Sequence, residues 1–389
     1  MTLFPILALA QNEVPDSIMT QELNEVVIEA SNQRTNVEVS TYIPMARQKN
    51  SAQNAVALLS QMSIPQIDVD PINLAVKTAH GQNVSIFINY IPATSADLQG
   101  MKTQDVKKVE YYTHPSDARF QSAKYVINFV MQKYEWGGYT KLTADKWFGV
   151  NRTEGSLYSK MTYKRMTFDV FADEIYLTNR HMGQSSTEHF NFTDFNGDGP
   201  MSITRNSYTK ASLYRNNSND FSVRALYNTE NIQISNRVSY SLTNIPHNDL
   251  TNSLSYSSDR FPASESSTIS SSKDWALNYV GGYFFMLSKQ VALNVDATYT
   301  YGRNSTNSNF RIPDDLSIIN NAKEDVHKFT TYLHLTWNPN KSNQFFSNFG
   351  VQHNWNIINY YGNSPSKQKY DVGVYFLGQN YQHIFNEKW

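Results

Sequence analysis

Residues 345–357, FFSNFGVQHNWNI, decide the fold of this chain because their side chains alternate in character. The odd positions are mostly apolar or aromatic, and the even positions are mostly polar or glycine. Successive side chains of a β-strand point to opposite faces, so the segment predicts a strand with one apolar and one wet face. A soluble sheet with a core face and a solvent face has the same periodicity, and that alternative stays open.

The same alternation recurs through the second part of the chain and predicts a membrane wall. On residues 290–302, the side chains expected to face lipid are Val291, Leu293, Val295, Ala297, Tyr299 and Tyr301. Those expected to face the lumen are Asn294, Asp296, Thr298 and Thr300. Tight turns are expected at 164–165, 216–219, 288–289 and 339–343, and long polar loops at 180–202, 258–274, 303–325 and 359–367. Short turns on one rim and long loops on the other are typical of an outer-membrane β-barrel.

Composition excludes several classes of function. The formal net charge is −1, so no basic excess points to nucleic acid. Cysteine is absent, which excludes disulfide scaffolds and thiolate metal sites. No run of about 18 apolar residues predicts a membrane helix. No Ser nucleophile or phosphate-loop motif occurs, so no enzyme activity or cofactor is expected, with an outer-membrane lipase or protease as the enzyme alternative.

Four segments are expected along the chain. Residues 1–10 end in an Ala-x-Ala pattern at Ala10 and resemble the remnant of a secretory signal peptide. Residues 11–36 are a linker, and 37–135 form a compact α+β domain with a helix over 54–62 and strands over 67–69, 84–88, 106–112 and 125–131. Residues 136–389 form the antiparallel transmembrane β-barrel, with about twelve strands. Those strands are expected at 138–148, 154–163, 166–179, 203–215, 220–228, 231–243, 252–257, 275–287, 290–302, 326–338, 343–358 and 368–384.

The α+β domain resembles the plug of TonB-dependent outer-membrane receptors of the Bacteroides type. The resemblance covers residues 22–135 and rests on the segments 22–30, 55–70, 84–92 and 105–130. It implies plug-motif positions at Asn89, Pro92, Glu110, Pro115, Phe120 and Asn128. Tyr90 departs from the family pattern, which usually has glycine there, so the turn at this position is expected to differ. Arg119 and Asp117 are expected to lock the plug to the barrel wall, because buried charges need partners.

The segment 11–36 before the plug is expected to hold a region that resembles a TonB box, together with the linker. The residues of the box-like region are Asn24, Glu25, Val26, Val27, Ile28 and Glu29. The resemblance implies that a periplasmic TonB-type protein pairs with it as an added β-strand, for which β-branched residues between polar ones are suited. The alternative is an ordinary first strand of the plug.

The length of the second segment does not fit a complete plugged transporter. Barrels that hold a plug have 22 strands, and each strand needs about 9–11 residues in the membrane. The chain is therefore expected to be part of a longer receptor. The alternative is a complete smaller barrel, which would be narrow for a plug of this size.

One loop resembles the start of a calcium-binding loop. Asp194, Asn196 and Asp198 occupy alternate positions before Gly199, but Arg205 stands where the bidentate Glu is needed. A turn-rich extracellular loop is the preferred interpretation, with a weak calcium site as the alternative.

The sequence thus predicts a mainly β outer-membrane receptor that imports an extracellular ligand in a TonB-dependent manner. Its expected partners are a TonB-type protein, outer-membrane lipid and a ligand that the sequence does not identify. Siderophore, cobalamin, glycan and peptide all stay open. The alternatives are a non-transporting barrel with a static plug, serving as an adhesin or ligand sensor, and a soluble β-rich binding protein.

Overall fold

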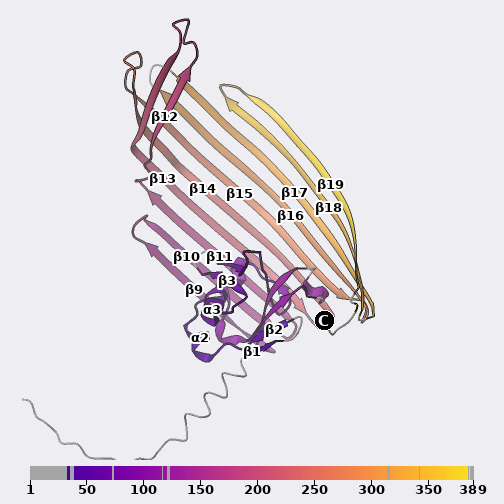
Figure 1. The fold of residues 1–389 in the computed structure, drawn as a ribbon. Helices are drawn as coiled ribbons and strands as arrows, with labels where there is room; N and C mark the ends of the chain where they lie inside the picture. Colours follow the sequence, from indigo (N-terminus) through magenta and orange to yellow (C-terminus); the bar gives the residue numbers. More distant parts are fainter. Residues whose placement is uncertain are drawn as a thin grey trace, which may run out of the picture.

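A computed structural model describes residues 33–35, 39–71, 74–115, 117–120, 123–312, 316–340, 342–383 and 385. It has a small α+β region followed by a long, curved antiparallel sheet (Figure 1). This confirms the predicted fold class. We call the described residues between 33 and 131 the plug-like region and the long sheet the wall. The predicted signal-peptide remnant at 1–10 and the TonB-box-like residues 24–29 lie outside the described residues.

The plug-like region is built on a six-stranded sheet with the order β1-β2-β7-β8-β5-β6. Neighbouring strands are antiparallel except β5 and β8, which run parallel. The bounds are β1 Gln33–Thr35, β2 Val39–Tyr42, α2 Ala46–Ser51, α3 Ala55–Met62, β3 Ile67–Asp70, β4 Ala75–Thr78, β5 Ser85–Ile88, β6 Ile91–Pro92, α4 Ser95–Gly100, η1 Thr103–Asp105, β7 Val106–Thr113, η2 Ala118–Phe120 and β8 Tyr125–Met131.

The plug-like region has an apolar core of its own. The predicted helix is present as α3, and the Asn54 side chain caps it by accepting a hydrogen bond from Ala57 N at 2.8 Å. Its apolar face buries Val56 and Leu59 completely. Two clusters of buried apolar side chains consist only of residues between Tyr42 and Met131. The region therefore does not depend on the wall for its core.

The wall is an 11-stranded sheet in which β19 to β13, then β11, β10 and β9 pair in succession, while β12 pairs only with β13. In the described residues this sheet is open, with β9 and β19 as its edges. The bounds are β9 Trp136–Trp147, β10 Arg152–Tyr163, β11 Met166–Asn179, β12 Ser185–Phe192, β13 Met201–Asn228, β14 Ile232–Tyr256, β15 Ser264–Met286, β16 Val291–Ile312, β17 Leu316–Asn340, β18 Asn343–Gly362 and β19 Ser366–His383. No helix of the described residues is long and apolar enough to cross a membrane.

Several wall strands are longer than the sequence predicts. The predicted turn at 216–219 is wrong, because β13 runs through it with a bulge and pairs with β11 and β14 on its two sides. The predicted loops 258–274 and 303–325 are mostly strand. A segment with polar residues on both faces lacks the alternation that predicts a strand, so it resembles a loop. It is a strand here because the neighbouring strands satisfy its backbone hydrogen bonds. The tight turn at 164–165 is present as predicted.

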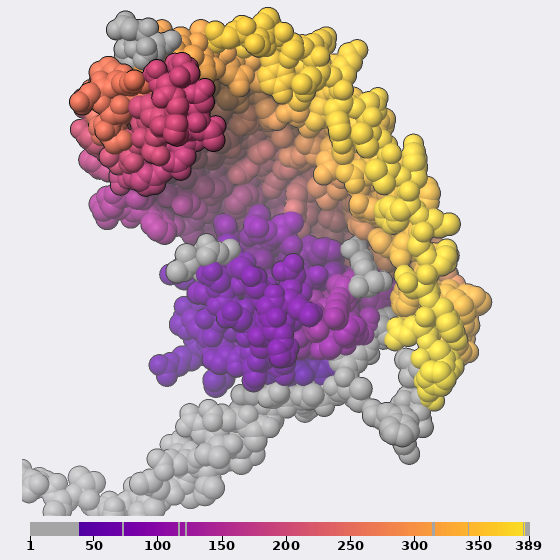
Figure 2. Space-filling view, turned by 45° about the horizontal axis from the view of Figure 1, so that its top comes forward, coloured from indigo at the N-terminus to yellow at the C-terminus, as the bar shows by residue number. Residues whose placement is uncertain are grey.

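The inner face of the wall holds the plug-like region, which lies in the hollow of the curved sheet (Figure 2). On β16, Asn294 is 3% exposed and its amide donates to the carbonyl of Ala118 in the plug-like region at 2.9 Å. Asp296 lines a small space beside the same region. Both residues face inward, as the alternation predicts.

The outer face carries two rows of aromatic side chains. One row lies near the short turns, and its members are Trp337, Phe345 and Tyr381, with ring centroids 5.0 and 4.8 Å apart. The second row consists of Trp275, Tyr301, His327 and Trp355, with successive centroids 5.3, 4.8 and 5.1 Å apart.

The distance between the two rows matches a membrane. His327 and Trp337 on β17, like Phe345 and Trp355 on β18, are ten residues apart. At about 3.4 Å per residue and a tilt of about 45°, the rows are separated by roughly 24 Å along the membrane normal. Outer-membrane barrels have an apolar band about 25 Å tall between aromatic girdles. The wall therefore has the height and outer chemistry of a membrane-spanning sheet.

Candidate functional site at the contact between the plug-like region and the wall

Two of the predicted plug-motif residues form a buried polar network. Glu110 on β7 is 4% exposed and Asn128 on β8 is completely buried. The Asn128 amide donates to Glu110 Oε2 at 2.9 Å, and the Tyr112 hydroxyl donates to the same oxygen at 3.0 Å. Lys108 Nζ lies 2.7 Å from Glu110 Oε1. Burial and the nearby Glu110 carboxylate raise the pKa of Tyr112, so it stays a neutral donor.

A third predicted residue, Asn89, sits in the adjoining turn with Tyr90. Both have positive φ, 50° and 66°, which non-glycine residues rarely adopt. Asn89 Oδ1 accepts a hydrogen bond from Met131 N at 2.9 Å, and Tyr90 lies under the Arg119 guanidinium, 3.5 Å from the ring centroid. Tyr90 N also donates to Asn128 Oδ1 at 3.0 Å. These contacts hold the turn in a shape for which the family-like pattern uses glycine.

The remaining predicted motif residues lie around this network. Phe120 is completely buried and its ring packs against those of Phe87 and Tyr112, with centroids 5.0 and 4.8 Å apart. Pro92 is exposed at the end of β6, whereas Pro115 lies in the loop after β7. The predicted motif residues thus lie on or beside β5, β6, β7 and β8 of the plug-like sheet, and their assignment as a plug motif stays a prediction.

The plug-like region meets the wall through hydrogen bonds to its backbone carbonyls. The donors are side chains of the wall strands β9 and β16. The pairs are Tyr139 Oη to Gly100 O (3.0 Å), Lys141 Nζ to Gln53 O (2.7 Å) and to Gln99 O (2.5 Å), and Asn294 Nδ2 to Ala118 O (2.9 Å). Backbone acceptors of this kind are available whatever the side chains are, so sequence patterns do not reveal them.

Gly100 is required for the close approach of α4 to the wall. A Cβ atom added there would lie 2.3 Å from the ring of Tyr158 on β10. Tyr158 is 4% exposed, so its ring has little room to move. The helix therefore ends in the one residue that leaves space for this ring.

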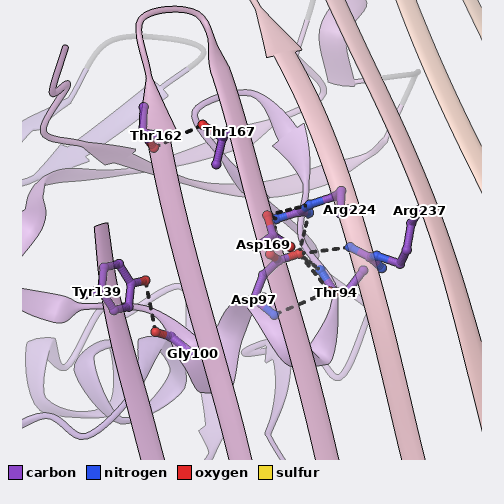
Figure 3. Close-up of polar contacts among 9 residues, drawn as sticks. All are labelled: Thr94, Asp97, Gly100, Tyr139, Thr162, Thr167, Asp169, Arg224 and Arg237. Atoms are coloured by element: carbon purple, nitrogen blue, oxygen red, sulfur yellow. Dashed lines mark hydrogen bonds and ion pairs between the residues drawn. The ribbon is translucent and has the colours of Figure 1, made fainter. Parts of the chain in front are cut away.

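A buried charge cluster joins the two parts of the molecule (Figure 3). Arg224 on β13 makes a bidentate ion pair with Asp97 on α4, and one of the two bonds, from Nη1 to Oδ2, is 2.9 Å long. Arg224 Nε and Nη2 also donate to Asp169 Oδ2 on β11 at 3.0 and 2.8 Å. Arg237 on β14 lies 3.4 Å from Asp97. We call these four residues the latch; its formal charges sum to zero.

Local structure prepares Asp97 for this role. It is the third residue of α4 and forms a capping box with Thr94, whose backbone N and hydroxyl donate to Asp97 Oδ2 at 2.9 and 2.7 Å. Asp97 is 4% exposed, and burial alone would raise its pKa. The Arg224 guanidinium and the Thr94 hydrogen bonds outweigh burial and lower the pKa of Asp97 below its usual value. Asp97 is therefore a carboxylate in the docked structure.

The latch is a site that sequence reasoning missed. The expected lock, Arg119 with Asp117, is instead an ion pair between neighbours inside the plug-like region. The Ala118 carbonyl between them is what accepts the bond from Asn294. A usable signal was present, since Asp169 is a charged residue within a predicted membrane strand, and such residues mark functional positions.

A cavity of about 1150 Å³ lies beside the latch, between the plug-like region and the wall. Its lining includes Asn89 and Pro92 from the one side and Lys160 and Arg224 from the other. Residues of the short turns at 164–165 and 229–231 also line it, which places it at the rim where these turns lie.

The calcium-loop candidate adopts the contacts of a turn. Asp194 Oδ1 accepts from Gly199 N at 2.9 Å, and Asp198 pairs with Arg260 at 2.9 Å. In the part of the chain that the structure describes, no group of three or more His, Asp or Glu side chains is placed to hold a metal. The two carboxylates at Asp194 and Asp198 are engaged elsewhere, and calcium binding here stays a prediction.

A small α+β region in the hollow of an antiparallel sheet with an aromatic-bounded outer face is the architecture of plugged outer-membrane barrels. No family model matches the sequence, and no curated protein matches it. Similar solved structures are transport receptors. The ferric yersiniabactin uptake receptor FyuA from Yersinia pestis is 10% identical, with a TM-score of 0.41 over 92% of this chain and 65% of that chain.

Two further similar structures are also those of a transporter and an outer-membrane receptor. The copper transporter OprC is 9% identical, with a TM-score of 0.39 over 92% of this chain and 62% of that chain. The pyoverdine outer membrane receptor FpvA from Pseudomonas aeruginosa PAO1 is 12% identical, with a TM-score of 0.36 over 91% of this chain and 61% of that chain. The chain spans less than two thirds of the length of these receptors. At these scores the similarities assign neither a ligand nor an activity to this chain.

Proposed function

We propose that this protein is a receptor of the Gram-negative outer membrane that binds an extracellular ligand and imports it with energy from a TonB-type protein. One observation carries the proposal. The plug-like region has an apolar core of its own, and neither of its two core clusters includes a wall residue. It is joined to the wall by hydrogen bonds and ion pairs instead.

This division suits a plug that moves as a unit. Separating two halves of an apolar core exposes surface at about 25 cal/mol per Å², and nothing in water replaces the lost contact. Polar groups that separate can instead form hydrogen bonds with water, so their net contribution is only about 0.5–1.5 kcal/mol for each neutral pair. The buried latch is the costly exception, which makes it the contact on which opening depends.

The TonB-box-like residues 24–29, on which the TonB-type protein is proposed to pull, come just before the edge strand of the plug-like sheet. Residues 24–29 precede β1, which is the edge strand of the plug-like sheet and pairs with β2. β2 pairs in turn with β7, which carries Glu110. A TonB-type protein that pairs with residues 24–29 by strand addition would therefore pull on the sheet through successive strands.

The test uses two separate variants of the full chain: one lacks residues 23–30, and the other carries Val27→Pro. Proline removes a backbone donor and blocks strand addition. A Ser31→Pro variant is the matched control, because it makes the same change outside the proposed box. Binding of the purified periplasmic domain of the organism's TonB-type protein is measured by calorimetry. Uptake of radiolabelled ferric siderophores, copper and cobalamin is measured in cells.

The proposal expects loss of TonB binding and of uptake in the deletion and in Val27→Pro, with both retained in Ser31→Pro. Ligand binding at the cell surface is expected to survive in all variants. If uptake of every compound that enters cells through this protein survives the deletion, TonB-dependent import is refuted. Surface binding without any uptake by the unaltered chain favours the non-transporting barrel.

A further inference from the structure

The cavity between the plug-like region and the wall is cationic. Its lining contains seven lysine or arginine residues and three aspartate or glutamate residues. Two of the three acidic residues are paired, and the third, Glu230, is exposed in the short turn at 229–231. Asp97 is paired with Arg224, and Asp105 is paired with Lys102 at 3.3 Å and accepts from the Tyr134 hydroxyl at 2.9 Å.

Several of the basic side chains are also engaged. Arg224 belongs to the latch, and Arg119 pairs with Asp117 and covers the ring of Tyr90. Lysines and arginines at the rim, such as Lys164 and Arg165, are exposed to solvent and lose little free energy by being unpaired. One lining cation fits neither group.

That cation is Lys160 on β10. It is partly buried, and its register neighbours are Tyr139 on β9 and Asp169 on β11. Asp169 already accepts two hydrogen bonds from Arg224, and Tyr139 donates to the plug-like region. Among the described residues, none makes a hydrogen bond or an ion pair with the Lys160 amine.

An ammonium group drawn out of bulk water without a partner is unfavourable, and an anion beside it removes most of that penalty. The side chain of Lys160 has three donors and points into a cavity large enough for a small ligand. In the neighbouring latch, the two carboxylates are already balanced by the two guanidinium groups.

We propose that this cavity binds an anionic oxygen group, a carboxylate or a phosphate, at Lys160. The inference rests on the proposed function for its biological role, since a ligand that passes between the plug-like region and the wall meets this cavity at the rim of short turns. It deepens that function by naming the class of cargo: small molecules that carry carboxylate or phosphate groups.

The test measures binding of citrate and of inorganic phosphate to the purified full chain in detergent by calorimetry. Lys160→Met removes the charge and keeps the length of the side chain, and Lys160→Arg keeps the charge. Lys146→Met is the matched control, because Lys146 on β9 is exposed, bonds to Asn151 and Thr153 and is not part of the lining.

The proposal expects saturable binding of at least one anion to the wild-type chain. A charge-assisted hydrogen bond is strong enough that Lys160→Met should weaken this binding by at least about tenfold. Lys160→Arg should bind within about threefold of wild type, and Lys146→Met should bind as wild type does. Absence of saturable binding by the wild-type chain, or unchanged binding by Lys160→Met, overturns the proposal.

A second measurement needs no folded variant at position 160. Lysine amines of the wild-type chain are labelled by reductive ¹³C-methylation, and their NMR signals are followed during the citrate and phosphate titrations. The Lys160 signal is expected to shift with saturation and the Lys146 signal to stay in place. A stationary Lys160 signal overturns the assignment of the site. Neither experiment includes a TonB-type protein, so failure here is distinct from failure of TonB-dependent uptake.

Discussion

Replacing Arg224 by methionine is expected to loosen the plug-like region from the wall. The change leaves Asp97 and Asp169, which are 4% and 6% exposed, without their shared cation. Arg237 remains, but it donates a single hydrogen bond to Asp97, 3.4 Å long. Removing one partner of a buried ion pair costs about 3–5 kcal/mol, because the other partner keeps an uncompensated charge.

The isosteric change Asp97→Asn should cost less. Arg224 keeps both hydrogen bonds to Asp169, so the most buried cation of the latch keeps a charged partner, whereas Arg237 loses its charged partner. We expect about 2–3 kcal/mol, which corresponds to the loss of hydrogen bonds to a charged group. The matched control is Asp198→Asn, which breaks an ion pair with Arg260 between side chains that are 61% and 55% exposed. Exposed pairs of this kind contribute about 0–1 kcal/mol.

Hydrogen exchange of the α4 amides, measured by mass spectrometry on the full chain in detergent, reports this docking. Leu98 N, which donates to Thr94 O at 3.0 Å, is one of the amides that exchanges only when α4 opens. A loss of 3–5 kcal/mol accelerates exchange by about two to three and a half orders of magnitude, since about 1.4 kcal/mol is tenfold. Amides at the centre of β17 provide the internal reference.

The expected order of acceleration is Arg224→Met, then Asp97→Asn, then Asp198→Asn. Combining Asp97→Asn with Arg237→Met restores neutrality, so this double variant should lose less than the sum of its single changes. Exchange of α4 in Arg224→Met at the same rate as in Asp198→Asn would refute the view that the latch holds the plug-like region.

Three further predictions concern the packing of Gly100, the membrane boundaries of the wall and the titration of Asp97. Gly100→Ala should destabilise docking by about 1–3 kcal/mol, because its Cβ would meet the Tyr158 ring at 2.3 Å, whereas Gly155→Ala, whose nearest atom is 3.9 Å away, should stay within about 0.5 kcal/mol in the same exchange measurement. Equal effects of the two alanines would contradict the close approach. Leu333→Arg, placed on the outer face between the aromatic rows, should cost about 2–4 kcal/mol in reversible folding into lipid vesicles. Ile319→Arg lies on the same face but beyond the second aromatic row, on the side away from the short turns, and should cost about 0–1 kcal/mol. Similar costs at both positions would contradict the assigned membrane boundaries. Because the folded-state pKa of Asp97 lies below its ordinary 3.8, its contribution to docking should be complete above about pH 4 and lost as the pH falls through the lowered value. Asp97→Asn should show a smaller loss of docking below pH 4, and an identical pH profile in both chains would rule Asp97 out as its source.

Local patterns were sufficient for much of the wall. Alternation assigns each side chain to a face as soon as a segment is a strand, so the inward positions Asn294 and Asp296 were predictable. Local patterns failed at 216–219 and in the supposed loops, where polar residues lie on both faces. There the strand exists because its neighbours supply hydrogen bonds, and no segment carries that information alone.

The polar network of the plug-like region could be predicted from local patterns, whereas the latch could not. Glu110, Phe120 and Asn128 lie on adjoining elements of one small region, and a family-like pattern pointed to all of them. Asp97 and Arg224 are separated by 127 residues. Nothing local couples a short helix in the plug-like region to a residue in the middle of a long strand.

For this protein, the amino-acid sequence alone determined a plug-like α+β region followed by strands with one apolar face, because strand periodicity and composition act over a few residues. Only the tertiary structure decided where the two parts touch. It placed α4 against β10 and β13. It took Arg119 out of the role of a lock and gave that role to Arg224, and it left Lys160 beside a cavity with no hydrogen bond or ion pair from the described residues. The physical reason is that the energy of a buried charge depends on which groups the fold brings within a few ångströms, and those groups come from distant parts of the chain.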